Sequence, residues 1–295
     1  MQSADFLSAV FFYLKEGENL NQNWIVENLN NAFSTWNGKL GELWGLVTTG
    51  PQTFKGGAVW SVMQTLHNGM VGIGYALVVL FFAISLCKNT MNFHELKRPE
   101  AAIHYFLRFV AAKALVGYGM DIMLNVFSIC NGIVTDMADS MGGISEAMVS
   151  LPAEMQTAIE NVGFLASIPL WLVTILGSLF ITVLSFVMTL TVYGRFFRLY
   201  MYTALAPLPL AAFAGESTQS VGISFLKSYV GVCLEGAVIV LACVIYSAFV
   251  STPTVTSGEA TTIVWSFLAE TVFNMLVLVG LIKGSDRIIH EMMGL

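Results

Sequence analysis

Long apolar stretches, separated by short connections rich in charge or glycine, dominate the pattern of hydrophobic and polar positions along the chain. The longest uncharged stretch covers residues 163–193 and is 31 residues long. A helix needs about 20 apolar residues to cross a bilayer core, at a rise of about 1.5 Å per residue. Further apolar stretches lie at residues 69–87, 105–133, 228–250 and 262–282. The pattern predicts an all-α polytopic membrane protein with about five transmembrane helices.

Residues 1–66 have a different pattern. Between residues 23 and 47 the apolar positions recur mostly at steps of three and four, which is typical of an amphipathic helix. These positions are Trp24, Leu29, Phe33, Trp36, Leu40, Leu43, Trp44 and Val47. The tryptophans suit a membrane–water interface, and a packed soluble subdomain is the alternative. We therefore expect an extracytoplasmic or interfacial region over residues 1–66 and a transmembrane domain over residues 67–295.

Composition narrows the class further. The chain is 56% hydrophobic and 11% charged, against about 25% charged in ordinary soluble domains. Its net charge of −6 gives no basic balance of the kind that binds nucleic acid tightly. The four cysteines have no metal-ligand spacing, and we expect them to be small buried hydrophobic residues. The N-terminus lacks the basic start and the cleavage site of a signal peptide, so we expect none. No phosphate-loop, HExxH or GxSxG motif occurs, so we expect no enzyme activity, metal or cofactor.

The charges between the apolar stretches predict which side of the membrane each connection faces. Basic residues mark the cytoplasmic side by the positive-inside rule. Lys88, Lys97, Arg98 and Arg108 come after the stretch at residues 69–87. Arg195 and Arg198 come after the stretch at residues 163–193. Residues 134–162 contain five acidic residues and no basic one, so we expect this loop outside.

A segment at residues 199–215 is apolar but contains Pro207 and Pro209. If it crossed fully, Lys227 and the basic residues at the C-terminal end would fall outside. Two prolines also disrupt helix geometry, and broken backbone at membrane depth is stable only against protein or water. We therefore expect a re-entrant or hairpin element on the cytoplasmic side, with the N-terminus outside and the C-terminus cytoplasmic. A sixth, kinked span is the alternative.

Ionisable residues inside the apolar stretches are candidates for function, because a charge at the bilayer centre costs about 2.5–3.5 kcal/mol on insertion scales. Lys113, Asp121 and Asn125 recur at multiples of four on the second stretch and predict a polar stripe there. Glu235 and Glu270 on the last two stretches are candidate partners for Lys113. The stripe predicts a pore lining or a polar contact between subunits, and an ion pair that holds helices together is the structural alternative.

Residues 193–215, YGRFFRLYMYTALAPLPLAAFAG, and residues 224–241, SFLKSYVGVCLEGAVIVL, carry a more specific signal. They resemble the TrbL-type polytopic inner-membrane proteins of conjugation and type IV secretion, in the form carried by Gram-positive conjugative elements. In that family a long span ends in basic residues, an "alaPlpla" segment follows, and a Lys-containing helix leads to an "LEG" span. The matching positions are Arg195, Arg198, Ala206, Pro207, Pro209, Lys227, Leu234, Glu235 and Gly236.

The resemblance implies a channel or scaffold subunit in a bacterial cytoplasmic membrane. The implied cargo is single-stranded DNA attached to a relaxase, with membrane lipid around the protein. Cytoplasmic ATPases and external pilus-like or cell-wall-acting components are the implied partners, and a homo-oligomeric ring is the implied assembly. The residues alone leave a second function open, a small-solute or ion transporter that uses Lys113, Asp121, Glu235 and Glu270.

Overall fold

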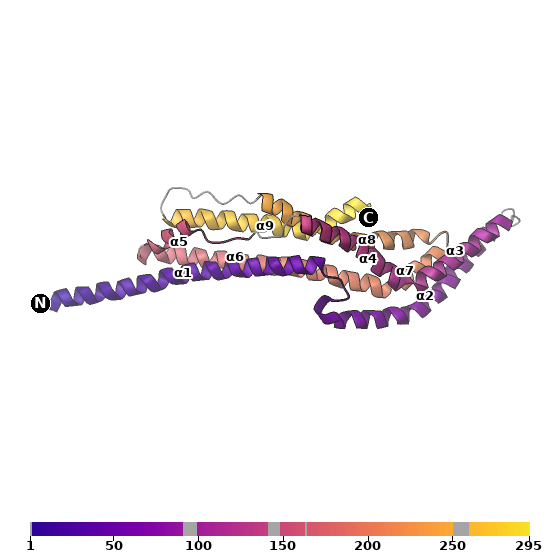
Figure 1. The fold of residues 1–295 in the computed structure, drawn as a ribbon, viewed down its shortest axis with the longest axis horizontal. Helices are drawn as coiled ribbons and strands as arrows, with labels where there is room; N and C mark the ends of the chain where they lie inside the picture. The colour runs from indigo at the N-terminus through magenta and orange to yellow at the C-terminus, as the bar shows by residue number, and fades with distance from the viewer. Residues whose placement is uncertain (1, 91–98, 141–147, 163, 250–259) are drawn as a thin grey trace. The chain divides into compact units, whose positions relative to one another are not determined.

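The apolar stretches fold into long helices in a computed structural model of the chain, which describes all residues except 1, 91–98, 141–147, 163 and 250–259 (Figure 1). Every regular element among the described residues is a helix, so the all-α prediction is confirmed. The helices are α1 (Gln2–Thr48), α2 (Ala58–Thr90), α3 (Pro99–Gly117), α4 (Gly119–Ser140), α5 (Ala153–Glu160), α6 (Phe164–Leu205), α7 (Pro207–Ala211), α8 (Gln219–Phe249) and α9 (Ala260–Met293), with short 3₁₀ turns at Phe54–Gly57 and Ala212–Ala214.

Within the part of the chain that the structure describes, four helical segments are long and apolar enough to cross a bilayer. They are Phe54–Lys88, Ile168–Leu205, Gln219–Phe249 and Thr262–Met293. A fifth crossing is possible where Ile103–Gly117 and Gly119–Asp139 follow one another with a bend of 73°. These segments confirm a polytopic membrane protein, and they extend beyond the apolar stretches from which the spans were predicted.

The bend between α3 and α4 corrects the prediction of one continuous helix over residues 105–133. It lies at Tyr118, between Gly117 and Gly119. A Cβ atom on Gly117 would approach the Tyr75 hydroxyl of α2 to 2.7 Å, so a residue larger than glycine would not fit without a shift there. The bend also interrupts the predicted polar stripe, because Lys113 lies on α3 whereas Asp121 lies on α4.

The chain divides into two compact units. The first contains Met1–Gly45, Met141–Thr191 and Leu241–Lys283. Within it, α1 packs on α6 and α9, since Trp24 lies 5.8 Å from Trp171 and Phe33 lies 6.3 Å from Phe267 between ring centroids.

The predicted amphipathic stripe of α1 is confirmed by burial. Its buried members are Leu29, Phe33, Trp36, Leu40, Leu43 and Val47, whereas Trp24 is exposed and Trp44 half-buried. The stripe packs on two helices that are themselves candidate spans, and the location of residues 1–66 outside or at the membrane surface stays a prediction.

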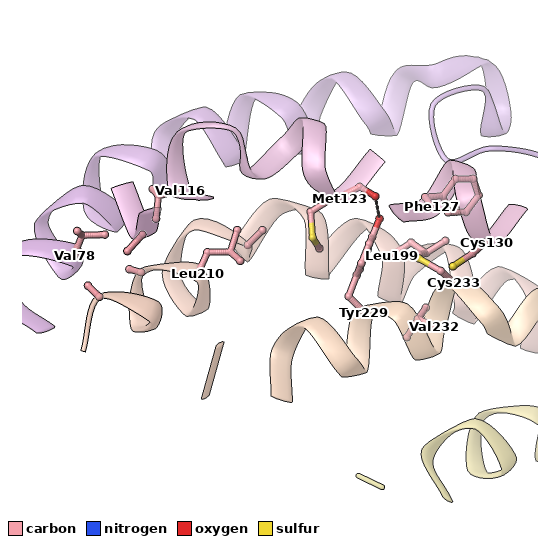
Figure 2. Close-up of a cluster of buried hydrophobic side chains, with 14 residues drawn as sticks. Val78, Val116, Met123, Phe127, Cys130, Leu199, Leu210, Tyr229, Val232 and Cys233 are labelled. Carbon is pink, nitrogen blue, oxygen red and sulfur yellow. Dashed lines mark hydrogen bonds between the residues drawn. The ribbon is translucent and has the colours of Figure 1, made fainter. Parts of the chain in front are cut away.

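The second unit contains Leu46–Ser140, Val192–Val240 and Gly284–Leu295. Its core joins α2, α3, α4, α6, α7 and α8 around buried apolar side chains (Figure 2). Within this core the Tyr229 hydroxyl donates to the Met123 carbonyl at 2.7 Å, and the Cys130 and Cys233 sulfurs point toward each other from α4 and α8. Cys130, Cys233 and Cys243 are buried, as expected, whereas Cys87 is exposed, contrary to that expectation.

The proline segment differs in extent from the predicted 199–215 element. Its first part belongs to α6, which continues to Leu205, and Pro207 begins the short helix α7. Pro207 has no N–H to donate to the Thr203 carbonyl four residues earlier. Buried His67 of α2 makes this bond instead, with Nδ1 2.7 Å from the Thr203 oxygen. Because a carbonyl can only accept, Nδ1 carries the proton.

Helix α7 packs against α2 and α3. Gly74 permits this approach, because a Cβ atom at that position would lie 3.0 Å from the Pro207 carbonyl oxygen. The prolines therefore lie in a short, well-packed helix, and the location of that helix on the cytoplasmic side stays a prediction. Lys97, Arg98 and residues 141–147 of the predicted outer loop lie outside the described residues.

Candidate functional site

Arg195 is the centre of a cluster of polar interactions in the second unit. It lies on α6, just after the predicted span at residues 163–193. Its side chain is fully buried, at 0% exposure. The guanidinium donates to the carbonyls of Val232 at 3.3 Å, Cys233 at 3.2 Å and Val47 at 3.3 Å. Val47 lies in the last turn of α1, where carbonyls have no partner within their own helix. Arg195 thus joins the end of α1 to the middle of α8.

Gly236 makes this arrangement possible. A Cβ atom on Gly236 would lie 2.8 Å from Arg195 Cζ, closer than van der Waals contact allows. The absence of a side chain at this turn of α8 opens the helix surface, so the guanidinium reaches the carbonyls of residues 232 and 233. The Gly236 position of the "LEG" segment therefore has a steric explanation.

A second arginine, one turn further along α6, completes the cluster. Arg198 Nη2 donates to both carboxylate oxygens of Glu235, at 2.7 and 2.8 Å. Its Nη1 donates to Asp286 of α9. The Ser285 hydroxyl donates to Glu235 at 3.2 Å. The Glu235 carboxylate is almost fully buried, and Arg198 is about one quarter exposed.

The formal charges of this cluster balance, since two arginines face Glu235 and Asp286. Buried charges are stable only when they are paired and their hydrogen-bonding capacity is used. Here Glu235 has donors from α6 and α9, and Arg195 has acceptors from α1 and α8. The cluster therefore links four helices, and its geometry suits a clamp that holds them in one arrangement rather than a group that exchanges protons or ligands.

The connection between α1 and α2 is fastened beside this cluster. The Tyr200 hydroxyl donates to the Pro51 carbonyl at 2.8 Å. The Phe54 ring stacks on Phe196, with centroids 4.0 Å apart and planes 12° apart. The Asn131 amide of α4 donates to the Thr48 carbonyl at 3.2 Å. Residues 48–54 are thus held by α6 and α4 rather than only joining two helices.

The residues that sequence predicted as one polar set fall into separate places. Glu235, one of the two candidate partners of Lys113, pairs with Arg198 instead. Lys113, Asp121 and Asn125 are exposed on α3 and α4, and Lys227 is exposed on α8. Glu270 is exposed on α9 within the first unit.

Asp121 and Asn125 do share a pocket, of about 520 Å³, with residues of the α1–α2 connection. Its other lining residues are Gly50, Pro51, Gln52, Leu124, Phe127, Ser128 and Asn131. Asp121 is the one acidic group in this lining. Among the described residues no group of three or more His, Cys, Asp or Glu side chains is placed to hold a metal ion.

Sequence reasoning missed three parts of the site. Asp286 and Ser285 directly follow the last apolar stretch, and an acidic residue between Lys283 and Arg287 was the signal that could have drawn attention to them. His67 lies just before the first apolar stretch with no motif around it. Its role depends on the carbonyl that Pro207 leaves free, which only the packing of α2 on α6 reveals.

Comparison with protein families decides the class. A model of the TrbL/VirB6 plasmid conjugal transfer-like proteins matches residues 36–207, which is more than half of the chain. The chain belongs to this family. The TrbL/VirB6 match includes Arg195, Arg198 and Pro207 and ends before Glu235, so the "LEG" part of the resemblance lies beyond it. No curated protein and no solved structure matches the chain. The protein is thus a multi-pass membrane subunit of the conjugal transfer or type IV secretion class.

Proposed function

We propose that this TrbL/VirB6-family chain is a channel or scaffold subunit that helps single-stranded DNA, attached to a relaxase, cross the bacterial cytoplasmic membrane. The family match over residues 36–207 is the observation that carries the proposal. The Arg195 cluster supports it, because a subunit that adjoins a moving polymer needs its helices locked together.

The proposed topology places the N-terminus outside and the C-terminus in the cytoplasm, since Arg195, Arg198 and Lys227 then lie on the inner side. Cytoplasmic ATPases supply the energy in this scheme, and external pilus-like or cell-wall-acting components continue the path. The subunit itself is not an enzyme and forms a homo-oligomeric ring. A net charge of −6 agrees with a conduit, because tight phosphate binding would retard the strand.

The transporter alternative relied on intramembrane carboxylates that are free to bind a solute or proton. Glu235, the most buried of them, is occupied by Arg198 and by Ser285. The pairing of Glu235 therefore favours the conjugation function over the transporter.

An in-frame deletion of the gene in a donor strain tests the proposal. We expect the deletion to abolish transfer to recipients while relaxase nicking at the transfer origin continues, because the block lies at membrane passage. Complementation with the wild-type gene is the control. Transfer at the wild-type frequency in the deletion strain would contradict the proposed role, and so would a loss of nicking, which would place the defect before translocation.

A further inference from the structure

The outward face of α1 has a composition that α6, which packs beside it, does not share. Opposite the buried stripe, every exposed side chain from residue 27 to residue 45 is polar or is glycine. These residues are Glu27, Asn30, Asn31, Ser34, Thr35, Gly38, Gly41 and Gly45. We call this set the α1 polar face. It spans 18 helical steps, about 27 Å at 1.5 Å per residue, which is close to the thickness of a bilayer core.

The outward face of α6 in the same unit has the opposite, apolar composition. Its exposed residues over the corresponding length are apolar. They are Ile168, Pro169, Leu172, Leu176, Leu179, Phe180, Val183, Phe186 and Leu190. An uninterrupted apolar face on a candidate span is what lipid contact requires. We therefore take α6 as the lipid-facing reference for this unit.

The two helices run side by side over this length. Trp24 of α1 lies against Trp171, near the start of the α6 span, and Phe33 lies against Phe267 on the α9 span. Further along, Val47 of α1 accepts a hydrogen bond from Arg195 of α6. The α1 polar face therefore lies at the same depth as the apolar stretch of α6.

Lipid cannot cover the α1 polar face at this depth, because asparagine and glutamate side chains lose their hydrogen bonds in hydrocarbon. Burial against a tightly packed apolar helix would carry the same cost. Water meets the requirement, and water at membrane depth must be enclosed by protein. We propose that the α1 polar face lines a water-filled passage that is enclosed by copies of this chain.

Two further features fit an aqueous lining that has room for a polymer. A Cβ atom added to Gly38, Gly41 or Gly45 would meet nothing within 4 Å, so the face is open along these turns. The neighbouring Lys39 is bound to Glu42 at 2.6 Å, so the face offers no unpaired basic side chain that would hold a phosphate tightly. This inference rests on the proposed function and adds to it the surface along which the strand would pass.

Cysteine accessibility in the assembled machine tests the inference. Each test variant carries one cysteine on α1, in place of Asn31, Ser34 or Gly38. Each matched control carries one cysteine on α6, in place of Leu176, Leu179 or Val183. All variants also carry Cys87→Ser, which removes the exposed native cysteine. The probe is a membrane-impermeant, charged thiol reagent added to mating donor cells. We expect the α1 positions to label about tenfold faster than the α6 positions, since neither a thiolate nor a charged reagent enters hydrocarbon. Equally slow labelling of both sets would overturn the lining, and equally fast labelling would overturn the membrane depth of this unit.

A bulky substitution gives a second readout. The Gly41→Leu side chain fits the open space around the helix, so we expect an unchanged amount of protein in the membrane. We expect transfer to fall about tenfold or more, because the apolar side chain then enters the passage. Gly41→Ser is the control and should retain transfer. Wild-type transfer by the leucine variant would contradict the lining. The two proposals fail separately: a deletion without effect on transfer removes the function, whereas unlabelled α1 cysteines in a transfer-competent strain remove only the lining.

Discussion

The Arg195 cluster and the Lys113–Asp121 region both place charges in apolar parts of the second unit, yet the structure treats them differently. Arg195 and Glu235 are almost completely buried, and partners from neighbouring helices satisfy both. Lys113 and Asp121 are exposed on two helices that meet at a 73° bend. The difference shows that the position of a charge along the chain does not reveal its role. A buried, fully bonded charge fixes helices, whereas an exposed charge remains available to water or to another subunit.

The largest effect should follow from Arg195→Leu. The substitution removes the donor to the carbonyls of Val47, Val232 and Cys233. Leaving a buried acceptor unpaired costs about 1–3 kcal/mol, so we expect a loss of about 3 kcal/mol or more in the free energy of unfolding. Denaturant titration of the purified protein in micelles measures it.

The matched control for that variant is Arg287→Leu. Arg287 is an exposed arginine that binds Glu291 one turn away on α9. Exposed pairs of this kind contribute about 0–1 kcal/mol, so its loss should be small. Equal losses in the two variants would remove the distinction between buried and exposed arginines.

Gly236→Ala should have the next largest effect. The added methyl group would occupy space within 2.8 Å of the Arg195 guanidinium, which its three hydrogen bonds hold in place. Overpacking of this kind costs about 1–3 kcal/mol. The same titration measures it, with Gly280→Ala as the control, because a Cβ atom there meets nothing within 4 Å. A destabilisation no larger than that of the control would show that the guanidinium moves freely.

Much of the fold follows from the sequence pattern because helical periodicity and apolar length are local properties. The buried stripe of α1 is confirmed in this way. The bend at Tyr118 was missed because an apolar stretch over residues 105–133 is long enough for one straight span, although Gly117 and Gly119 were a visible signal.

The candidate site was predicted only in part, because the choice of partner for a charge depends on packing. Arg195, Arg198 and Glu235 were each singled out, but Glu235 was considered as one of two candidate partners for Lys113. Arg198 pairs with Glu235 because it lies on α6 directly opposite Glu235 of α8. Backbone acceptors such as the Val47 carbonyl have no sequence signature at all.

A smaller effect should connect His67 to Pro207. His67→Ala leaves the Thr203 carbonyl without its donor, so we expect a loss of about 1–2 kcal/mol in the free energy of unfolding. Pro207→Ala restores an N–H at the position that reaches this carbonyl in a continuous helix. In the Pro207→Ala background the histidine substitution should therefore cost less. Identical costs in the two backgrounds would contradict the proposed replacement of one donor by the other.

The smallest effects on stability should come from Lys113→Gln and Asp121→Asn. Both side chains are exposed, and substitutions at such positions usually change the free energy of unfolding by no more than about 0.5 kcal/mol. If either substitution lowers transfer while stability stays unchanged, the exposed charges act in contacts between subunits or along the conduit. A loss of stability comparable to that of Gly236→Ala would instead assign them to the clamp.

The coupling between Arg198 and Glu235 tests the clamp most directly. Unfolding free energies of Arg198→Gln, Glu235→Gln and the double variant give the interaction energy of the pair. We expect a coupling of about 2 kcal/mol, since both Glu235 oxygens accept from Arg198 and the carboxylate is buried. Additive losses, with a coupling near zero, would contradict the account, because the cluster would then be a contact without a role in holding the helices together.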